Sequence, residues 1–473
     1  MIVIFVHGWS VTDTNTYGLL PEAIAKQASN YGLNIDIKHI WLGRYISFND
    51  TVNMTDIIRA FDQALRDQIP AGDHIAEFSC ITHSTGGPVV REWLNHYYGS
   101  HNLAQSPLRH LVMLAPANHG SPLAALGKQR VGRIKAWFDG VEPGQLILDW
   151  LSLGSQQQID LAKAYLDYQP ASNRFYPFVL TGQSIDKKFY DFVNNYLTEP
   201  GSDGVVRVSG ANMNFSMVKF VESEETDTVS HMSENLAVSL LKPVNGFNRP
   251  EPVPIGVVPN ASHSGKSKGI MRSIASANSK KVQLAEILKC LQVTSPDDYQ
   301  QRQLALSALT QQTQKRSHRY INLVFIVKDD QGVPITDYDL VLLGGPNREP
   351  DKLSKGFFID RQKNAANPNH LVYYIDYDVI IKSKLTGFRI IARPDQGFSF
   401  YHPVEFRDET AEIDALLKPN ETLYIEVVIH RRVDQAVFLF DEASNPQMHK
   451  KGKLIKTETR HNFKEQKPID KPI

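Results

Sequence analysis

The 473-residue sequence predicts an α/β domain with a mostly parallel sheet and flanking helices, followed by a separate β-rich domain of antiparallel, sandwich-like type. Three observations predict this division. The chain is longer than one hydrophobic core usually serves. Residues 1 to about 310 alternate short apolar runs with longer helical patterns, as parallel sheets with helices on both faces do. From about residue 319, six or more alternating runs follow with turn sequences between them and no helical pattern.

In the first domain, the elements follow one another in a strand–helix rhythm. An apolar β-branched run, IVIFV, opens the chain, and residues 55–69 place five apolar side chains on one helical stripe. The segment AEFSCITH predicts a further strand, and PVVREWLNHYY predicts a helix with Pro88 in its first turn. Strand-like runs continue at 109–120, 176–183 and 203–210, and VQLAEILKCLQV predicts a late helix.

The predicted domains are residues 1–312 for the α/β part and 319–441 for the β-rich part. In the second of these, the run YINLVFIVKD places Ile321, Leu323, Phe325 and Val327 on one face of a strand. The alternation indicates a sheet with its own hydrophobic core.

Two segments carry two interpretations each. An amphipathic insertion near 121–175 includes Trp137, Phe138 and Trp150, and it represents either helices packed on the sheet or a lid over an apolar substrate site. The tail, 442–473, is rich in lysine with a few apolar residues, and it is either a solvated terminus or a segment that binds anionic lipid.

Composition limits the partners and the compartment. Lys+Arg and Asp+Glu are equal at 51 each, so no overall field favours nucleic acid as a partner. Two cysteines, Cys80 and Cys290, exclude a disulfide framework and a zinc site, and no metal is expected. The N-terminus lacks the pattern of a signal peptide, and no apolar run is long enough to span a bilayer. We therefore expect a cytoplasmic or peripherally membrane-associated protein, or one that reaches the cell surface by a route outside the general secretory pathway.

The segment THSTG, residues 82–86, carries the chemistry. It lies between a predicted strand and a predicted helix, the context of the nucleophile turn of α/β-hydrolases, written G-x-S-x-G. Ser84 takes the nucleophile's place and Gly86 the small position that follows, whereas Thr82 stands where the pattern has glycine. A serine-rich turn that caps the helix is the alternative. The context favours the nucleophile.

A serine needs a base that an acid holds, and this fold orders them serine, acid, histidine. Asp203 lies in a glycine-flanked loop ahead of a predicted apolar strand. Among later histidines, His263 lies in a Gly/Ser/Asn-rich loop, whereas His231 stands beside a helix start; the loop position favours His263 as the base. His119 precedes the acid in the chain and fits the order poorly.

Two backbone N–H groups are expected to hold the oxyanion that forms when a serine attacks an acyl carbonyl. Thr85 follows the nucleophile directly, and Trp9 follows His7-Gly8 after the first strand. With these donors the predicted reaction is ester hydrolysis through an acyl-serine intermediate.

The segments VIFVHGWSVTDTNTYGLLP, CITHSTGGPVV, MLAPANHGSPLAALGK, GSDGVVRV and SHSGKSKGIMRSI resemble the bacterial PlaB-type phospholipases A/lysophospholipases A. That family has THSTG in place of G-x-S-x-G. The resemblance implies Ser84, Asp203 and His263 as the catalytic residues, and the HSGK context then decides against His231.

The same resemblance implies what the protein acts on and binds. The implied substrates are phospholipids and lysophospholipids, with peripheral membrane contact and a C-terminal domain that activity requires. It further implies self-association, as a tetramer, with a nicotinamide dinucleotide as an interface ligand and no cofactor for the chemistry. A soluble carboxylesterase or thioesterase, and an inactive hydrolase fold that serves as a binding module, are the alternatives.

Overall fold

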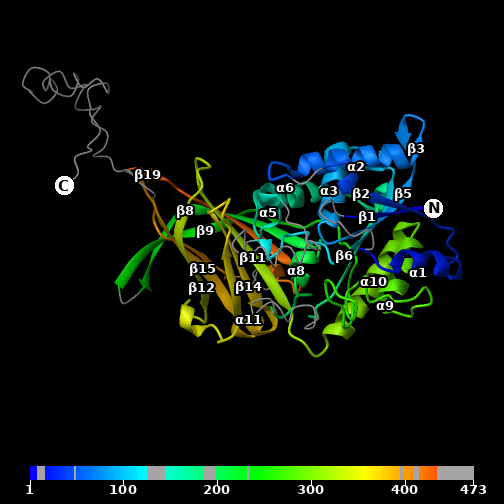
Figure 1. Ribbon diagram of the computed structural model, residues 1–473. Coiled ribbons are helices and arrows are strands. Elements are labelled where there is room, and N and C mark those ends of the chain that lie inside the picture. The colour runs from blue at the N-terminus through cyan, green and yellow to red at the C-terminus, as the bar shows by residue number, and fades with distance from the viewer. Residues whose placement is uncertain are drawn as a thin grey trace, which may run out of the picture.

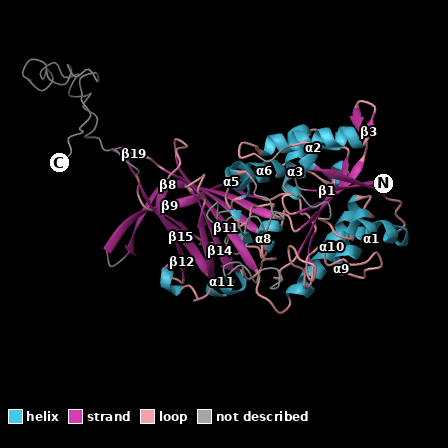
Figure 2. Ribbon diagram, in the orientation of Figure 1, coloured by secondary structure: helices cyan, strands magenta, loops and turns pink. Residues whose placement is uncertain are grey.

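The computed structural model describes residues 1–7, 16–46, 49–124, 144–185, 199–231, 234–394, 399–409 and 415–433. Figure 1 shows an α/β part that holds the N-terminus and a β-rich part beside it. Figure 2 shows that helices gather around the first part, whereas strands dominate the second.

The first part is built on a parallel sheet with the strand order β10-β7-β6-β5-β1-β2. Its strands are β1 (Ile2–His7), β2 (Asp36–Trp41), β5 (Phe78–His83), β6 (Leu108–Leu114), β7 (Tyr176–Thr181) and β10 (Ile255–Val257). A short hairpin, β3 (Pro70–Ala71) and β4 (His74–Ile75), lies apart from this sheet. The predicted α/β-hydrolase class is confirmed by this sheet and the helices around it.

Helices cover both faces of the parallel sheet. One face packs against α2 (Met54–Gln68), α3 (Gly86–Tyr97), α5 (Gln145–Leu151) and α6 (Gln156–Tyr165). The other packs against α1 (Leu20–Gln27), α9 (Val282–Leu291) and α10 (Pro296–Gln314). Helix α2 begins at a capping box between Asn53 and Asp56, and its predicted apolar stripe is buried. The apolar period of the sequence therefore places this helix correctly.

The second sheet is mixed, with the order β12-β15-β17-β9-β8-β18-β11-β14-β13. Its strands are β8 (Phe215–His231), β9 (Glu234–Asn248), β11 (Tyr320–Asp329), β12 (Asp337–Gly344), β13 (Phe358–Lys363), β14 (His370–Asp376), β15 (Leu385–Arg393), β17 (Val404–Arg407) and β18 (Thr422–Ile429). Helix α11 (Tyr377–Ser383) follows β14, and β16 (Ser399–Phe400) pairs with β19 (Arg432–Val433).

Three pairings in this sheet are parallel, which differs from the antiparallel arrangement expected. Two of the three involve the hairpin β8–β9, which comes from residues 215–248, inside the range assigned to the first domain, and the third joins β11 to β18. The hairpin inserts at the centre of the second sheet, where β8 pairs with β18 and β9 pairs with β17. A hairpin from the predicted first domain is therefore part of the second sheet.

Strand β11 shows how the second sheet joins the first part. Ile321, Leu323 and Phe325 alternate as predicted and fill the core of the second sheet. Val324 and Ile326, on the opposite face, belong to the hydrophobic core that also contains α3, α5 and α6. One face of the sheet is therefore its own core and the other is an interface with the α/β part.

The described part of the 121–175 insertion packs in this shared core. Ile147, Leu148 and Trp150 of α5 are buried, and α6 contributes Ile159. Trp137 and Phe138 lie outside the described residues, so the lid stays a prediction. The lysine-rich tail, 442–473, also lies outside them.

Candidate active site

Ser84 stands at a sharp turn between β5, which ends at His83, and α3, which begins at Gly86. Its φ is +53°, in the left-handed region that residues other than glycine rarely adopt. The backbone N–H of Ser84 donates to the carbonyl of Leu114 at 3.0 Å, which ties the turn to the neighbouring strand β6. The strained turn is the geometry that lifts a nucleophilic serine above a sheet.

Small residues beside the turn let the strand and the helix approach each other. A Cβ added to Gly86 would lie 3.2 Å from the Cβ of Thr82, closer than ordinary contact. Thr82 itself is fully buried. A threonine therefore fits at the position where the pattern has glycine because its neighbour across the turn, Gly86, has no side chain.

The structure brings the three predicted side chains together. The Nε2 atom of His263 lies 3.0 Å from the Oγ of Ser84, and its Nδ1 lies 2.9 Å from Oδ2 of Asp203. The backbone N–H of His263 also donates to the carbonyl of Asp203 at 3.0 Å. His263 and Asp203 are fully buried, whereas Ser84 is 8% exposed. A reactant can therefore approach this chain of contacts from the serine side.

The second oxygen of Asp203, Oδ1, accepts hydrogen bonds from the N–H groups of Val205 and Val206, at 3.0 and 2.8 Å. These bonds leave Oδ2 for the imidazole and fix the rotation of the carboxylate. They also explain a difference from the prediction of a strand over 203–210. By accepting these two hydrogen bonds, the Asp203 carboxylate stabilises a turn in place of a strand, and the short helix α8 (Val208–Ala211) follows.

The other candidate histidines lie elsewhere. His119 shares a hydrogen bond with the hydroxyl of Tyr424 at 2.7 Å, and burial together with the nearby Arg91 guanidinium lowers the pKa of His119 to about 3. His231 ends β8, opposite Glu234 in the hairpin. The predicted N–H donor Thr85 follows Ser84 and precedes α3, whereas Trp9 lies outside the described residues.

His83 belongs to the site, although sequence reasoning did not single it out. Its ring packs on the ring of His263, with 4.6 Å between centroids, and its Nε2 lies 3.2 Å from the carbonyl oxygen of His263. Burial, followed by the nearby His263, holds the pKa of His83 well below its usual range. A neutral imidazole here donates to that carbonyl and supports the loop of the base. Its place inside THSTG is the only signal that the sequence offers.

Gly182, which follows β7, is expected to be required for the position of His263. A Cβ at residue 182 would lie 2.0 Å from the carbonyl oxygen of Ala261, two residues before the base. Gly182→Ala should therefore move this loop, cost about 1–3 kcal/mol of stability and lower kcat about a hundredfold. Steady-state kinetics and thermal unfolding measure the two effects. Wild-type kcat in a destabilised variant would contradict the expectation.

The arrangement suits nucleophilic catalysis. An imidazole in contact with a hydroxyl can take its proton, and a buried carboxylate on the other ring nitrogen stabilises the imidazolium that results. The exclusion of water strengthens both interactions.

No protein-family model matches the chain, and no curated protein compared with it matches. Two solved structures of phospholipase PlaB from Legionella pneumophila do match, one of them in complex with thio-NAD. They are 44% and 45% identical to this chain, cover 93% of it and 95% of their own chains, and have TM-scores of 0.81. The chain belongs to the PlaB phospholipase family.

Membership in the PlaB family confirms the resemblance seen in the sequence and the assignment to carboxylic ester hydrolases. Within the part of this PlaB-family chain that the structure describes, no helix is both long and apolar enough to cross a membrane.

Proposed function

We propose that this protein hydrolyses fatty-acyl esters of phospholipids and lysophospholipids through an acyl-serine intermediate. The observation that carries the proposal is the continuous contact from Ser84 Oγ through the His263 ring to the Asp203 carboxylate. The PlaB relatives support the choice of substrate, because their name is that of a phospholipase.

In this proposal His263 Nε2 takes the proton of Ser84 as the serine oxygen attacks the acyl carbonyl. Asp203 holds the other ring nitrogen and stabilises the imidazolium. The N–H groups of Thr85 and Trp9 stabilise the oxyanion. His263 then gives the proton to the leaving alcohol, and water, activated by the same imidazole, releases the fatty acid and restores Ser84.

Further parts of the proposal concern the setting of the reaction. The protein contacts the membrane peripherally and associates with copies of itself, as a tetramer. It takes a nicotinamide dinucleotide as an interface ligand, since a PlaB relative is seen with thio-NAD. A cavity of about 680 Å³ carries Lys315 and Arg316, whose charges suit a diphosphate, whereas Arg319 in the same lining is paired with Asp378. Ester hydrolysis involves no oxidation or reduction, so the nicotinamide dinucleotide takes no part in any step of the reaction.

Two measurements test the proposed function. A fluorophosphonate probe should label the protein on the peptide that contains Ser84, as mass spectrometry can establish. Phosphatidylcholine vesicles should release fatty acid and lysophospholipid, and lysophosphatidylcholine should release fatty acid, when the protein is added.

The alternatives predict different results. Hydrolysis of a short water-soluble ester, without release from vesicles, would identify a soluble carboxylesterase or thioesterase. Absence of both labelling and hydrolysis would identify a hydrolase fold that serves as a binding module.

A further inference from the structure

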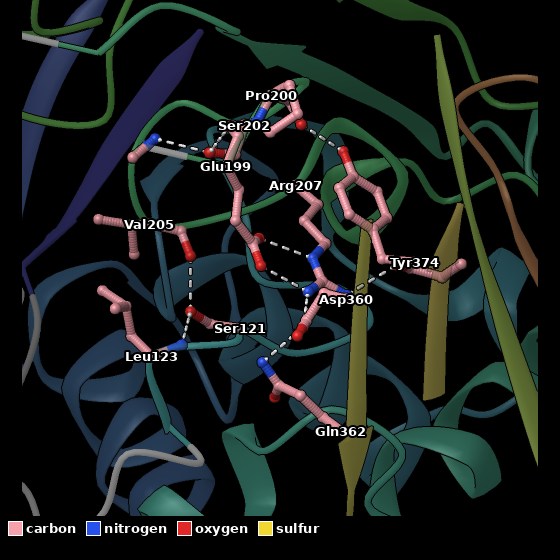
Figure 3. A network of polar contacts seen from close by, with 12 residues as sticks. Ser121, Leu123, Glu199, Pro200, Ser202, Val205, Arg207, Asp360, Gln362 and Tyr374 are labelled. Atoms are coloured by element: carbon pink, nitrogen blue, oxygen red, sulfur yellow. Dashed lines mark hydrogen bonds and ion pairs between the residues drawn. The ribbon is translucent and has the colours of Figure 1, made fainter. Parts of the chain in front are cut away.

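The loop that carries Asp203 is held from outside by the second sheet, and Arg207 makes the connection (Figure 3). We propose that Arg207 is a positioning residue, through which Asp360 and Tyr374 of the second sheet keep the Asp203 carboxylate in line with His263. The inference rests on the proposed function, because it assigns Arg207 a part in the same reaction.

Arg207 is a buried cation between the two parts of the molecule. Its side chain is 1% exposed. The guanidinium donates to both carboxylate oxygens of Glu199, at 2.9 and 2.8 Å, and forms an ion pair with Asp360 of β13. It also donates to the side-chain oxygen of Asn322 of β11 at 3.2 Å. Two strands of the second sheet therefore contribute partners to one side chain of the first part.

The aromatic ring of Tyr374, on β14, completes the contact. The guanidinium carbon of Arg207 lies 4.1 Å from the ring centroid, and the Tyr374 hydroxyl donates to the carbonyl of Pro200 at 2.8 Å. Tyr374 thus touches the loop at two points, before and after Asp203. Figure 3 shows the ring beside the guanidinium, with the hydroxyl directed at Pro200.

Backbone hydrogen bonds connect Arg207 to Asp203 within the same loop. Ser202 and Arg207 form a β-bridge, and the N–H of Val208 donates to the carbonyl of Gly201 at 2.9 Å. Inside this closed loop, the N–H of Asp203 donates to the carbonyl of Val206 at 3.1 Å. The N–H groups that fix the Asp203 carboxylate belong to Val205 and Val206, between the bridge residues. A shift of Arg207 therefore moves the donors on which the carboxylate rests.

Arg207 is charged, and its carboxylate partners stabilise this charge in the buried site. Burial alone would lower the pKa of Arg207, but the Glu199 carboxylate, followed by Tyr374 and Asp360, outweighs burial, so the pKa is raised and the side chain stays charged. A buried guanidinium that loses a carboxylate is driven to find water or another acceptor. Asp360 is the partner that can be changed with the least disturbance, because its side chain is 28% exposed.

A double-mutant cycle tests the inference on the full chain. Asp360→Asn and Tyr374→Phe are each made alone and in an Asp203→Asn background, and kcat, KM and thermal unfolding are measured on vesicles and on a soluble ester. Each single variant should lower kcat about ten- to a hundredfold with KM within about twofold. In the Asp203→Asn background neither substitution should lower kcat further.

The matched control is Asp339→Asn, which breaks an exposed ion pair with Arg393 on another strand of the same sheet and should leave kcat unchanged in both backgrounds. If the two test substitutions lower kcat equally with and without the Asp203 carboxylate, the contacts around Arg207 have only a general structural role. Wild-type kcat in both Asp360→Asn and Tyr374→Phe would overturn the inference outright. If Asp203→Asn itself retains wild-type kcat, Asp203 is not the catalytic acid and the inference is overturned. Absence of hydrolysis by the wild-type protein would instead contradict the proposed function, so the two failures are distinct.

Discussion

Ser84→Ala is expected to lower kcat for ester hydrolysis by about six orders of magnitude, the loss that removal of a serine nucleophile causes in a serine protease. The substitution removes the oxygen that lies 3.0 Å from His263 Nε2 and leaves the imidazole without a proton to take. The proposed oxyanion donors are unchanged by the substitution, so a residual rate about 10³-fold above that in water should persist. The effect is measured by kinetics on vesicles, with an assay for released fatty acid that is sensitive enough to detect the residual rate.

Ser209→Ala is the matched control for this experiment. Ser209 is also buried, and its hydroxyl has no hydrogen-bond partner in the part of the chain that the structure describes. This variant should keep kcat, whereas Ser84→Ala should unfold at nearly the wild-type temperature without activity. More than a tenth of wild-type kcat in Ser84→Ala would show that another group is the nucleophile.

Truncation after Gln314 is expected to abolish both the folded state and the activity. The shortened chain keeps β8 and β9 but loses β17 and β18, with which they pair. Val218, Phe220 and Leu241, buried in the core of the second sheet, would face water. Two unpaired strand edges and an exposed apolar face favour aggregation. Solubility on expression, size-exclusion chromatography and kinetics measure the outcome.

A chain of residues 1–445 is the control for the truncation. It keeps every strand that the structure describes and should fold and hydrolyse esters. If the 1–314 protein were soluble, monomeric and active, the shared sheet would be dispensable, and Arg207 would have no positioning partner across the interface.

Local pattern was enough to predict the elements whose cause is local. The apolar period located α2, the alternation of Ile321, Leu323 and Phe325 located β11, and THSTG located the turn at Ser84. The strand expected after Asp203 is absent because a side-chain carboxylate captures two backbone N–H groups, which apolar spacing does not reveal.

Contacts between segments far apart in the sequence could not be predicted from local patterns. The pairing of Phe215 with Thr422 joins strands that no short window contains. His83 contacts His263, and Arg207 contacts Asp360, only when segments far apart in the chain meet. Trp9 lies outside the described residues, so its role stays a prediction.

The place of the β8–β9 hairpin in the chain also sets the order in which a ribosome can complete this enzyme. The hairpin emerges between the acid and the base, long before its neighbours β17 and β18 are translated. At ordinary elongation rates the wait is on the order of ten to thirty seconds. Strands β11, β13 and β14, which contact the loop of Asp203, are translated during that interval, and β18 follows them. Because the second sheet is complete only when β18 has been translated, ester hydrolysis should begin only near the end of translation.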